Sequence, residues 1–224
     1  MTGSIRVCRV EFSYSGLSGS FRLGPVDVDL EPGKLIFWIG GNGSGKSTLA
    51  RILAGEIRAS SGEVLGLTDK VTYHHQALEE NIFPTLTVSE HLRLLAHRGD
   101  ELLSVLLRSF PELADSASLY PDQLSGGQLQ LLAFAGMVLR PSKVWIFDEV
   151  LNHLDSRTSS RVMDWIAQEL VTPNSVVVLI THDLAAVASR ADLAVVFNQG
   201  RISHTLQPSQ EGIDASELAS IIAH

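Results

Sequence analysis

The chain predicts an α/β fold built on a mainly parallel sheet with helices on both faces. Three observations lead to that prediction. Short, almost wholly apolar segments, which are typical of strands buried on both sides, recur along the 224 residues. Amphipathic helical segments alternate with them. A glycine-rich loop joins one such strand, residues 35–39, to a helix over residues 48–55.

Two strands are expected before that loop. Residues 5–12 alternate apolar and polar side chains with a slip in phase near the middle, and residues 21–30 place alternate apolar side chains on one face. Pro32 and Gly33 favour a tight turn into the next strand. Tyr14 follows the first strand, and is either a core tyrosine or an exposed ring that could stack on a base. Taken alone, the core interpretation is favoured.

Further elements follow the loop in alternation. Strands are expected at residues 63–67, 70–74, 144–149, 175–180 and 193–197. Helices are expected at residues 90–97, 101–110, 129–139, 156–170, 184–191 and 211–224. Ser89 is the expected N-cap of the helix that starts at residue 90. Residues 60–62 are expected to break the chain before the strand at residue 63.

The composition narrows the class of protein. With 45% hydrophobic and 19% charged residues, the chain provides for a sizeable core. A net charge of −8 argues against a general nucleic-acid-binding surface. Cys8 is the single cysteine, which excludes an intrachain disulfide and fits a reducing compartment. The sequence shows no signal-peptide pattern and no apolar run of the roughly 20 residues that span a bilayer. We therefore expect a cytosolic protein, or one held at a membrane by a partner.

The glycine-rich loop has the spacing of a phosphate-binding loop, Gly, four residues and Gly-Lys-Ser. It consists of Gly40, Gly41, Asn42, Gly43, Ser44, Gly45, Lys46, Ser47 and Thr48. Glycines let backbone N–H groups turn toward phosphate oxygens, and the helix N-terminus adds partial positive charge. Lys46 would reach the β- and γ-phosphates, and the Ser47 hydroxyl would bind Mg²⁺. The flanking strand and helix disfavour the alternative of a glycine loop with an incidental lysine.

Two acids, Asp148 and Glu149, end a buried apolar strand. A buried carboxylate is unfavourable without a partner. Beside a phosphate-binding loop, Mg²⁺ and its waters are the natural partner of Asp148, and Glu149 is then placed to polarise a water. The alternative is that the two acids cap the next helix.

Two further patterns in the sequence are weaker. Gly126 and Gly127 precede an apolar helix and would make a second phosphate-compatible site; without the phosphate-binding loop, an ordinary glycine turn with a cap is the favoured interpretation. His74 and His75 suggest a metal site, but neighbours on a strand point to opposite faces, and no Cys or second His pair lies at zinc spacing. No metal site is expected at these histidines.

Together these stretches resemble the nucleotide-binding domain of ABC-type ATPases over residues 7–202. The motifs stand in the family's order, with Walker A at residues 40–48, the Q-loop at Gln76, the signature LSGGQ at residues 124–128, Walker B at residues 144–149, the D-loop at Leu154 and Asp155, and the H-loop at His182. The intact signature is the most specific of them. Tyr14 matches the family's adenine-stacking aromatic position, which reverses the preference for the core interpretation.

The resemblance implies a P-loop NTPase fold, in which a RecA-like core with a mainly parallel sheet carries an antiparallel β subdomain and an inserted α-helical subdomain. Residues 1–224 would form a single ABC ATP-binding domain. Its core and β subdomain would take about residues 1–76 and 138–224, and the helical signature subdomain about residues 77–137.

The resemblance also implies that two such domains enclose two ATP molecules head to tail. Each ATP would contact Walker A of one subunit and the signature of the other. Tyr14 would then stack on adenine, residues 40–48 would hold the phosphates, and Ser125 and Gly127 would meet the partner subunit's ATP.

Metal binding and catalysis are implied in the same way. Ser47, Gln76 and Asp148 would hold Mg²⁺. Glu149 would be the general base or water-orienting group, and Gln76 and His182 would be the other catalytic residues.

Some positions depart from the family's usual pattern. They are Val150 in place of proline, Asn152 and His153 in place of small residues, and Leu129 and Gln130 after the signature. The implied catalytic residues are all kept.

The expected function is the ATPase subunit of a membrane transporter at the cytoplasmic face of the membrane. Its partners would be transmembrane permease subunits and a second nucleotide-binding domain, with no nucleic acid. The alternative is a soluble ABC ATPase of translation, DNA repair or cluster assembly, whose usual second cassette, coiled-coil insert or zinc module is not visible here. A GTPase is disfavoured because His153 stands where the guanine-reading motif has lysine.

Overall fold

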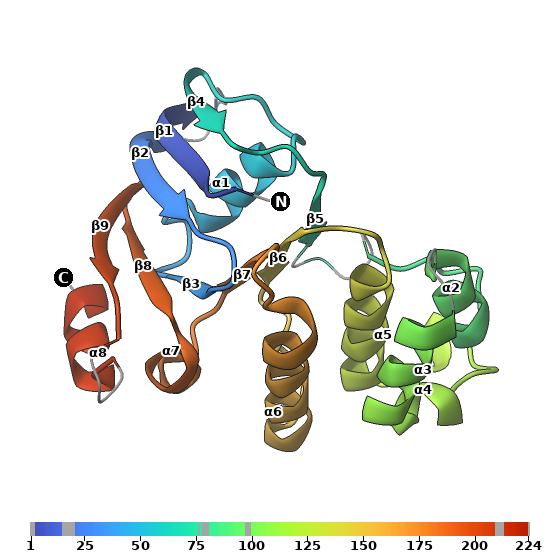
Figure 1. Cartoon of the computed structure of the whole chain (residues 1–224). Helices are drawn as coiled ribbons and strands as arrows, with labels where there is room; N and C mark the ends of the chain where they lie inside the picture. The colour runs from blue at the N-terminus through green and yellow to red at the C-terminus, as the bar shows by residue number, and fades with distance from the viewer. Residues whose placement is uncertain are drawn as a thin grey trace. The chain divides into compact units, whose positions relative to one another are not determined.

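The strands of the protein form two sheets, as the computed structural model shows (Figure 1). The structure describes residues 3–14, 21–75, 77, 81–96, 100–208 and 213–223. The chain divides into two units. Unit one comprises Met1–Tyr73, Lys143–Ile146 and Val171–His224, and unit two comprises His74–Ser142 and Phe147–Leu170.

The larger sheet has six strands in the order β5-β6-β7-β3-β8-β9. Their bounds are β5 Val71–His74, β6 Val144–Asp148, β7 Val176–Ile180, β3 Leu35–Ile39, β8 Leu193–Asn198 and β9 Arg201–Leu206. β3 pairs in parallel with both β7 and β8, while β9 runs antiparallel to β8. Every residue of β3, β6 and β7 is buried, as expected from their uninterrupted apolar sequences. The predicted mainly parallel sheet is confirmed.

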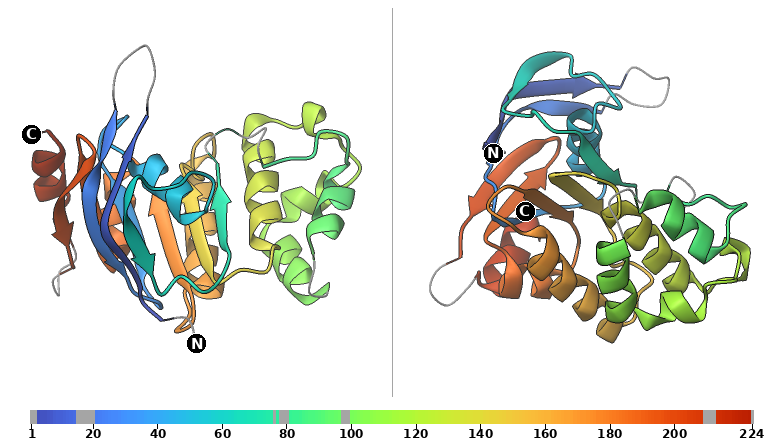
Figure 2. Two further views of the ribbon diagram at one scale, coloured as in Figure 1. Left: turned by 90° about the horizontal axis from the view of Figure 1, so that it is seen from above. Right: turned by 45° about the vertical axis from the view of Figure 1, so that its right-hand side comes forward.

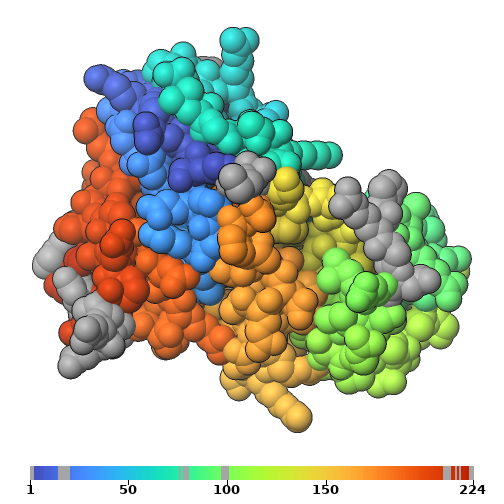
Figure 3. All heavy atoms as spheres, in the orientation of Figure 1, coloured from blue at the N-terminus to red at the C-terminus, as the bar shows by residue number. Residues whose placement is uncertain are grey.

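The smaller sheet is antiparallel, with the order β2-β1-β4. Its strands are β1 Ile5–Ser13, β2 Arg22–Leu30 and β4 Ser61–Leu65, which lie side by side in blue to teal (Figure 3). The predicted slip in phase of β1 is a bulge, because the register with β2 shifts between Val7 and Val10. Arg9 inside the bulge has a φ of 48°.

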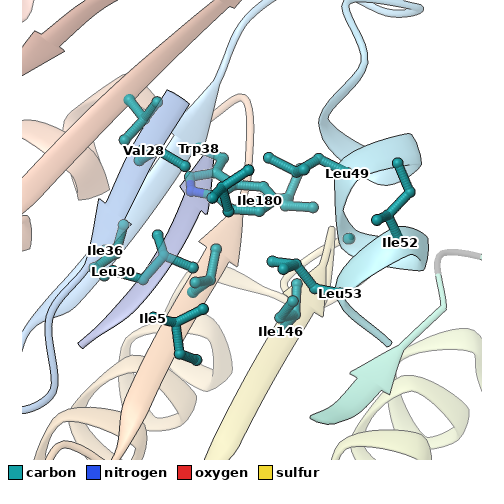
Figure 4. Packing of buried hydrophobic residues seen from close by; sticks show 14 of the residues in the cluster. Ile5, Val28, Leu30, Ile36, Trp38, Leu49, Ile52, Leu53, Ile146 and Ile180 are labelled. Carbon is teal, nitrogen blue, oxygen red and sulfur yellow. The ribbon is translucent and has the colours of Figure 1, made fainter. Parts of the chain in front are cut away.

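The core of unit one lies between the two sheets and helix α1 (Lys46–Leu53). The apolar face of α1 presents Leu49 and Leu53 to the packed cluster, where Leu49 lies near Ile180 and Trp38, and Leu53 lies near Ile146 (Figure 4). Trp38 is fully buried, and its ring centre lies 5.3 Å from that of Phe197. Helices α7 (Leu184–Arg190) and α8 (Ala215–Ala223) also belong to unit one.

Unit two is mainly helical, and Figure 2 shows α2 to α5 gathered together in green to yellow. Its elements are α2 Val88–Leu95, α3 Asp100–Ser109, α4 Pro111–Asp115, the 3-10 helix η2 Pro121–Gln123, α5 Gly126–Val138, α6 Ser156–Trp165 and the π-helix η3 Ile166–Leu170. Phe134 of α5 is the centre of its aromatic core. The Phe134 ring centre lies 5.5–5.9 Å from those of Phe110, Phe147 and Trp165.

Two local predictions are wrong. Thr87, not Ser89, is the N-cap of α2, because its side chain accepts from the Glu90 amide while the Glu90 carboxylate accepts from the Thr87 amide. Ser61 and Gly62 do not break the chain but begin β4, since Cys8–Glu63 and Glu11–Ser61 are pairing partners.

Among the helices that the structure describes, none is both long and apolar enough to cross a membrane.

Candidate functional site

The glycine-rich loop of unit one needs glycine at both of its ends. Gly40 leaves β3 with a φ of 139°, and a Cβ there would lie 2.1 Å from the carbonyl oxygen of Phe197. Gly45 is the N-cap of α1 with a φ of 109°, and a Cβ there would lie 2.6 Å from Leu23 Cδ1. A side chain at either position would clash, so the loop conformation depends on the residue types that the sequence supplies.

Lys46 is the first residue of α1, and its ammonium lies inside the loop. Its Nζ donates to the Gly40 oxygen at 2.7 Å, the Gly41 oxygen at 3.0 Å and Ser44 Oγ at 3.3 Å. Helix α1 has no side-chain cap and no acidic residue in its first turn. The lysine charge and the positive end of the helix dipole therefore meet at one place, which favours a bound anion.

A hollow of about 190 Å³ lies beside the loop within unit one. It is lined by Gly41, Asn42, Gly43, Ser44, Val196, Phe197, Asn198, Gln199 and Ile221. The amide of Gly200 donates to the Ser44 oxygen at 3.0 Å, which holds the loop against the turn between β8 and β9. Ser47 is half-buried and Thr48 is buried.

Tyr14 is exposed at the end of β1. The structure therefore favours an exposed ring that could stack on a base over a tyrosine of the core. Its side chain is 40% exposed, and its ring meets Phe12 edge-on with the centres 4.7 Å apart. Arg51 of α1 donates from Nη1 to the Tyr14 hydroxyl at 3.3 Å. Tyr14 therefore lies beside the helix that Lys46 begins.

His182 leaves the sheet next to the loop. It follows β7, which pairs in parallel with β3, so the carboxyl ends of both strands meet at one edge. The amide of Thr181 donates to the Trp38 oxygen at 3.3 Å, and the His182 side chain is exposed. The structure thus brings His182 and the glycine-rich loop to the same edge of unit one.

Asp148 and Glu149 belong to unit two and are both buried, with 2% and 8% of their surface exposed. Asp148 ends β6. Glu149 has a φ of 54°, a left-handed conformation that residues other than glycine adopt rarely. Such outliers gather at functional sites. The acids do not cap the next helix, because Asp155 is the N-cap of α6.

The D-loop leads directly into α6. Asp155 Oδ1 accepts from the amides of Arg157 and Thr158 at 2.9 and 3.0 Å, and Oδ2 accepts from the Thr158 hydroxyl at 2.7 Å. The hydrogen bonds from Thr158, followed by that from Arg157, lower the pKa of the Asp155 carboxyl. The carboxylate therefore fixes the start of α6.

The signature begins α5 of unit two. Ser125 is the N-cap, its Oγ accepts from the Gln128 amide at 3.3 Å, and Gln128 Oε1 accepts from the Ser125 amide at 2.9 Å. Gln128 also donates from Nε2 to Ser116 Oγ at 3.1 Å. Ser125 and Gly126 are exposed. The glycine turn is therefore a capped helix start that also presents backbone to solvent.

Gln76 lies outside the residues that the structure describes. Gln128 and Gln130 make side-chain hydrogen bonds that sequence analysis did not foresee. The spacing of Ser125 and Gln128 is that of a capping box, and this signal could have identified the hydrogen bonds between these two residues, but neither the bond of Gln128 to Ser116 nor that of Gln130 to Val150.

Comparison with known proteins identifies the family. The model of the family described as "ABC transporter" matches residues 23–152, more than half of the sequence. The chain belongs to the ABC transporter family. In this ABC family member the LSGGQ signature begins helix α5, and the glycine-rich loop leads into helix α1.

The chain is similar in sequence to ATP-binding proteins of import and transport systems. It is 30% identical over 216 residues to the sulfate/thiosulfate import ATP-binding protein CysA of Halalkalibacterium halodurans, covering 86% of this chain and 59% of that protein. It is 30% identical over 206 residues to the glutamine transport ATP-binding protein GlnQ of Geobacillus stearothermophilus, covering 83% of this chain and 84% of that protein. The chain spans about three fifths of the length of the CysA relatives that it matches.

Solved structures confirm the ABC ATPase fold. An ATP-binding subunit of an ABC transporter superposes with a TM-score of 0.83 at 22% identity, over 98% of this chain and 99% of that one. The dimeric structure of MJ0796, a bacterial ABC transporter cassette, superposes with a TM-score of 0.75 at 25% identity, over 91% of this chain and 98% of that one.

Proposed function

We propose that this protein binds and hydrolyses ATP as the nucleotide-binding subunit of an ABC transporter. It would work as a dimer around two ATP molecules, at the cytoplasmic face of the membrane, with separate transmembrane permease subunits. The observation that carries the proposal is the buried ammonium of Lys46 inside the glycine loop, at the uncapped N-terminus of α1. The names of CysA and GlnQ, import and transport ATP-binding proteins, support it.

Within unit one, the proposal assigns nucleotide binding to the loop and to Tyr14. Lys46 and the amides of residues 40–48 would hold the phosphates, exchanging the lysine's present acceptors for phosphate oxygens. The exposed ring of Tyr14 would stack on adenine. His182, at the same sheet edge as the loop, would contact the γ-phosphate.

The donor set suits Mg²⁺, which prefers oxygen ligands. Ser47 offers a half-buried hydroxyl, and Asp148 offers a carboxylate at the end of β6. On the resemblance of this chain's motifs to those of ABC ATPases, Ser47, Gln76 and Asp148 would hold the ion. Bound Mg²⁺ would neutralise charge on the β- and γ-phosphate oxygens.

Glu149 would orient the attacking water and accept its proton. Ser125 and Gly127 of the signature would donate to the ATP held by the partner subunit, and their contribution would be complete only in the closed dimer. Hydrolysis would thus require two copies of this chain, or this chain and a related one.

ATP binding by Lys46→Ala tests the assignment of the loop. Loss of the ammonium should weaken ATP binding at least about tenfold in titration calorimetry, since hydrogen bonds to charged groups contribute about 1.5–3 kcal/mol each. Lys34→Ala is the matched control, because Lys34 is a surface lysine of the same unit whose partner is Glu31 at 2.7 Å. Equal affinity of wild type and Lys46→Ala for ATP would show that the loop does not bind the nucleotide.

Purification of the chain from detergent-solubilised native cells tests the transporter assignment. A multi-span membrane protein recovered at comparable stoichiometry supports the proposal. Recovery with soluble proteins, ribosomes or DNA factors alone would favour the soluble ABC ATPase.

A further inference from the structure

A buried hydrogen bond in unit two joins the signature helix to the segment after Glu149. Gln130 of α5 is only 2% exposed, and its Nε2 donates to the carbonyl oxygen of Val150 at 2.8 Å. Val150 is itself buried and directly follows Glu149. A buried carbonyl that loses its donor is destabilised by about 1–3 kcal/mol. The bond therefore restrains the peptide next to the acid.

The restrained segment has an unusual backbone. Glu149 has a φ of 54° and His153 a φ of 66°, both in the left-handed region. The amide of Asn152 donates to the Glu149 oxygen at 3.0 Å and closes a turn between them. Residues in this region are strained and keep their conformation only where neighbouring groups hold them. Gln130 supplies such a restraint from a different element.

Helix α5 meets the same segment at a second point. Gly127 has no side chain, and a Cβ there would lie 3.1 Å from the carbonyl oxygen of His153. Gly127 and Gln130 are three residues apart, so they lie on one face of α5. The face of the signature helix that approaches His153 thus also holds the peptide after Glu149.

We propose that Gln130 is a positioning residue for ATP hydrolysis, which fixes the turn after Glu149 and so the direction of its carboxylate. The inference rests on the catalytic role proposed for Glu149. Gln130 acts through the backbone, and its loss affects the orientation of the acid rather than the loop that holds the phosphates. Its effect is therefore on the turnover number and not on the affinity for ATP.

The variant Gln130→Met tests this role, because methionine keeps the length of the side chain and removes the donor. The turnover number should fall about tenfold, the loss expected from one hydrogen bond, while KM changes less than about twofold. Val138→Ala is the control matched for a loss of stability. Val138 is a buried residue about two turns further along the same helix, and its variant should keep full turnover.

Hydrogen–deuterium exchange gives a readout that does not depend on activity. Amides of residues 150–154 should exchange faster in Gln130→Met than in wild type, and should not in Val138→Ala. Unchanged exchange in Gln130→Met, unchanged turnover, or a fall in turnover that Val138→Ala reproduces would each overturn the inference. Failure of the proposed function itself would appear differently, as absence of ATP hydrolysis by the wild type.

Discussion

The guanidinium of Arg161 on α6 forms a two-pronged ion pair with the carboxylate of Glu112 on α4. Nη1 lies 2.5 Å from Oε1, and Nη2 lies 3.1 Å from Oε2. Nη2 also donates to the carbonyl oxygen of Ser109, and the guanidinium carbon lies 5.1 Å from the centre of the Phe110 ring. Within unit two, the helix that follows the D-loop is therefore tied to α3 and α4.

Replacing Arg161 with methionine should lower the free energy of unfolding by about 1–2 kcal/mol. The bidentate geometry makes the pair stronger than an average surface pair, while its partial exposure limits the gain. Arg157→Met, at an exposed position on the same helix, should change the free energy by less than about 0.5 kcal/mol. Urea denaturation of the two variants measures both, and equal losses would contradict a specific role for Arg161.

The same ion pair has a predictable dependence on pH. The hydrogen bond from Arg161 lowers the pKa of Glu112 below its ordinary value of 4.5. A lowered carboxyl pKa gives stability that is complete above the unfolded value and is lost as the pH falls through the folded one. The difference between wild type and Arg161→Met should stay constant from about pH 7 to 5.5 and shrink in more acidic solution. A difference that grows in acid would refute this assignment.

Helices α2 and α5 approach closely where His91 lies over Gly136. A Cβ on Gly136 would lie 2.6 Å from His91 Nε2 and 2.9 Å from Leu95 Cδ1. Gly136→Ala should therefore destabilise the fold by about 1–3 kcal/mol, although alanine is the better helix former. In the background His91→Ala most of that loss should disappear, which a double-mutant cycle measures. Strictly additive losses would mean that the two residues do not compete for space.

The lowered pKa of His91 leads us to expect a loss of stability in mild acid. Burial, followed by the charge of Arg140, lowers the pKa of His91 from 6.5 to about 4. The unfolded chain therefore binds a proton that the folded chain does not, and stability present above pH 6.5 is lost as the pH falls toward 4. The loss from this one residue should reach about 2 kcal/mol at pH 5. His91→Asn should flatten this part of the curve, and a curve of unchanged slope would show that His91 is not the group responsible.

Much of the fold follows from local patterns in the sequence. The buried strands were predictable because a run such as residues 176–180 is apolar at every position, and the bulge in β1 because its alternation slips. The glycine loop was predictable because its spacing of glycine, lysine and serine stands between a buried strand and a helix. The common sheet edge of His182 and the loop follows from the parallel order of β3 and β7.

Contacts between residues far apart in the chain could not be predicted from the sequence. Gln130 and Val150 are 20 residues apart, and Arg161 and Glu112 are 49 apart, so nothing local pairs them. The N-cap of α2 was missed for a different reason. Thr87 and Ser89 are both suitable, and the position of Glu90 three residues after Thr87 decides between them.

Glu149 is proposed to catalyse hydrolysis in a dimer that encloses ATP. The variant Glu149→Gln tests this role, with steady-state turnover measured beside the molecular mass in light scattering, with and without ATP and Mg²⁺. We expect turnover to fall at least about 100-fold, ATP binding to remain, and ATP to convert the variant into a stable dimer. Turnover within a few-fold of wild type would remove Glu149 from the catalytic role, and a variant that stays monomeric with bound ATP would rule out the ATP-enclosing dimer.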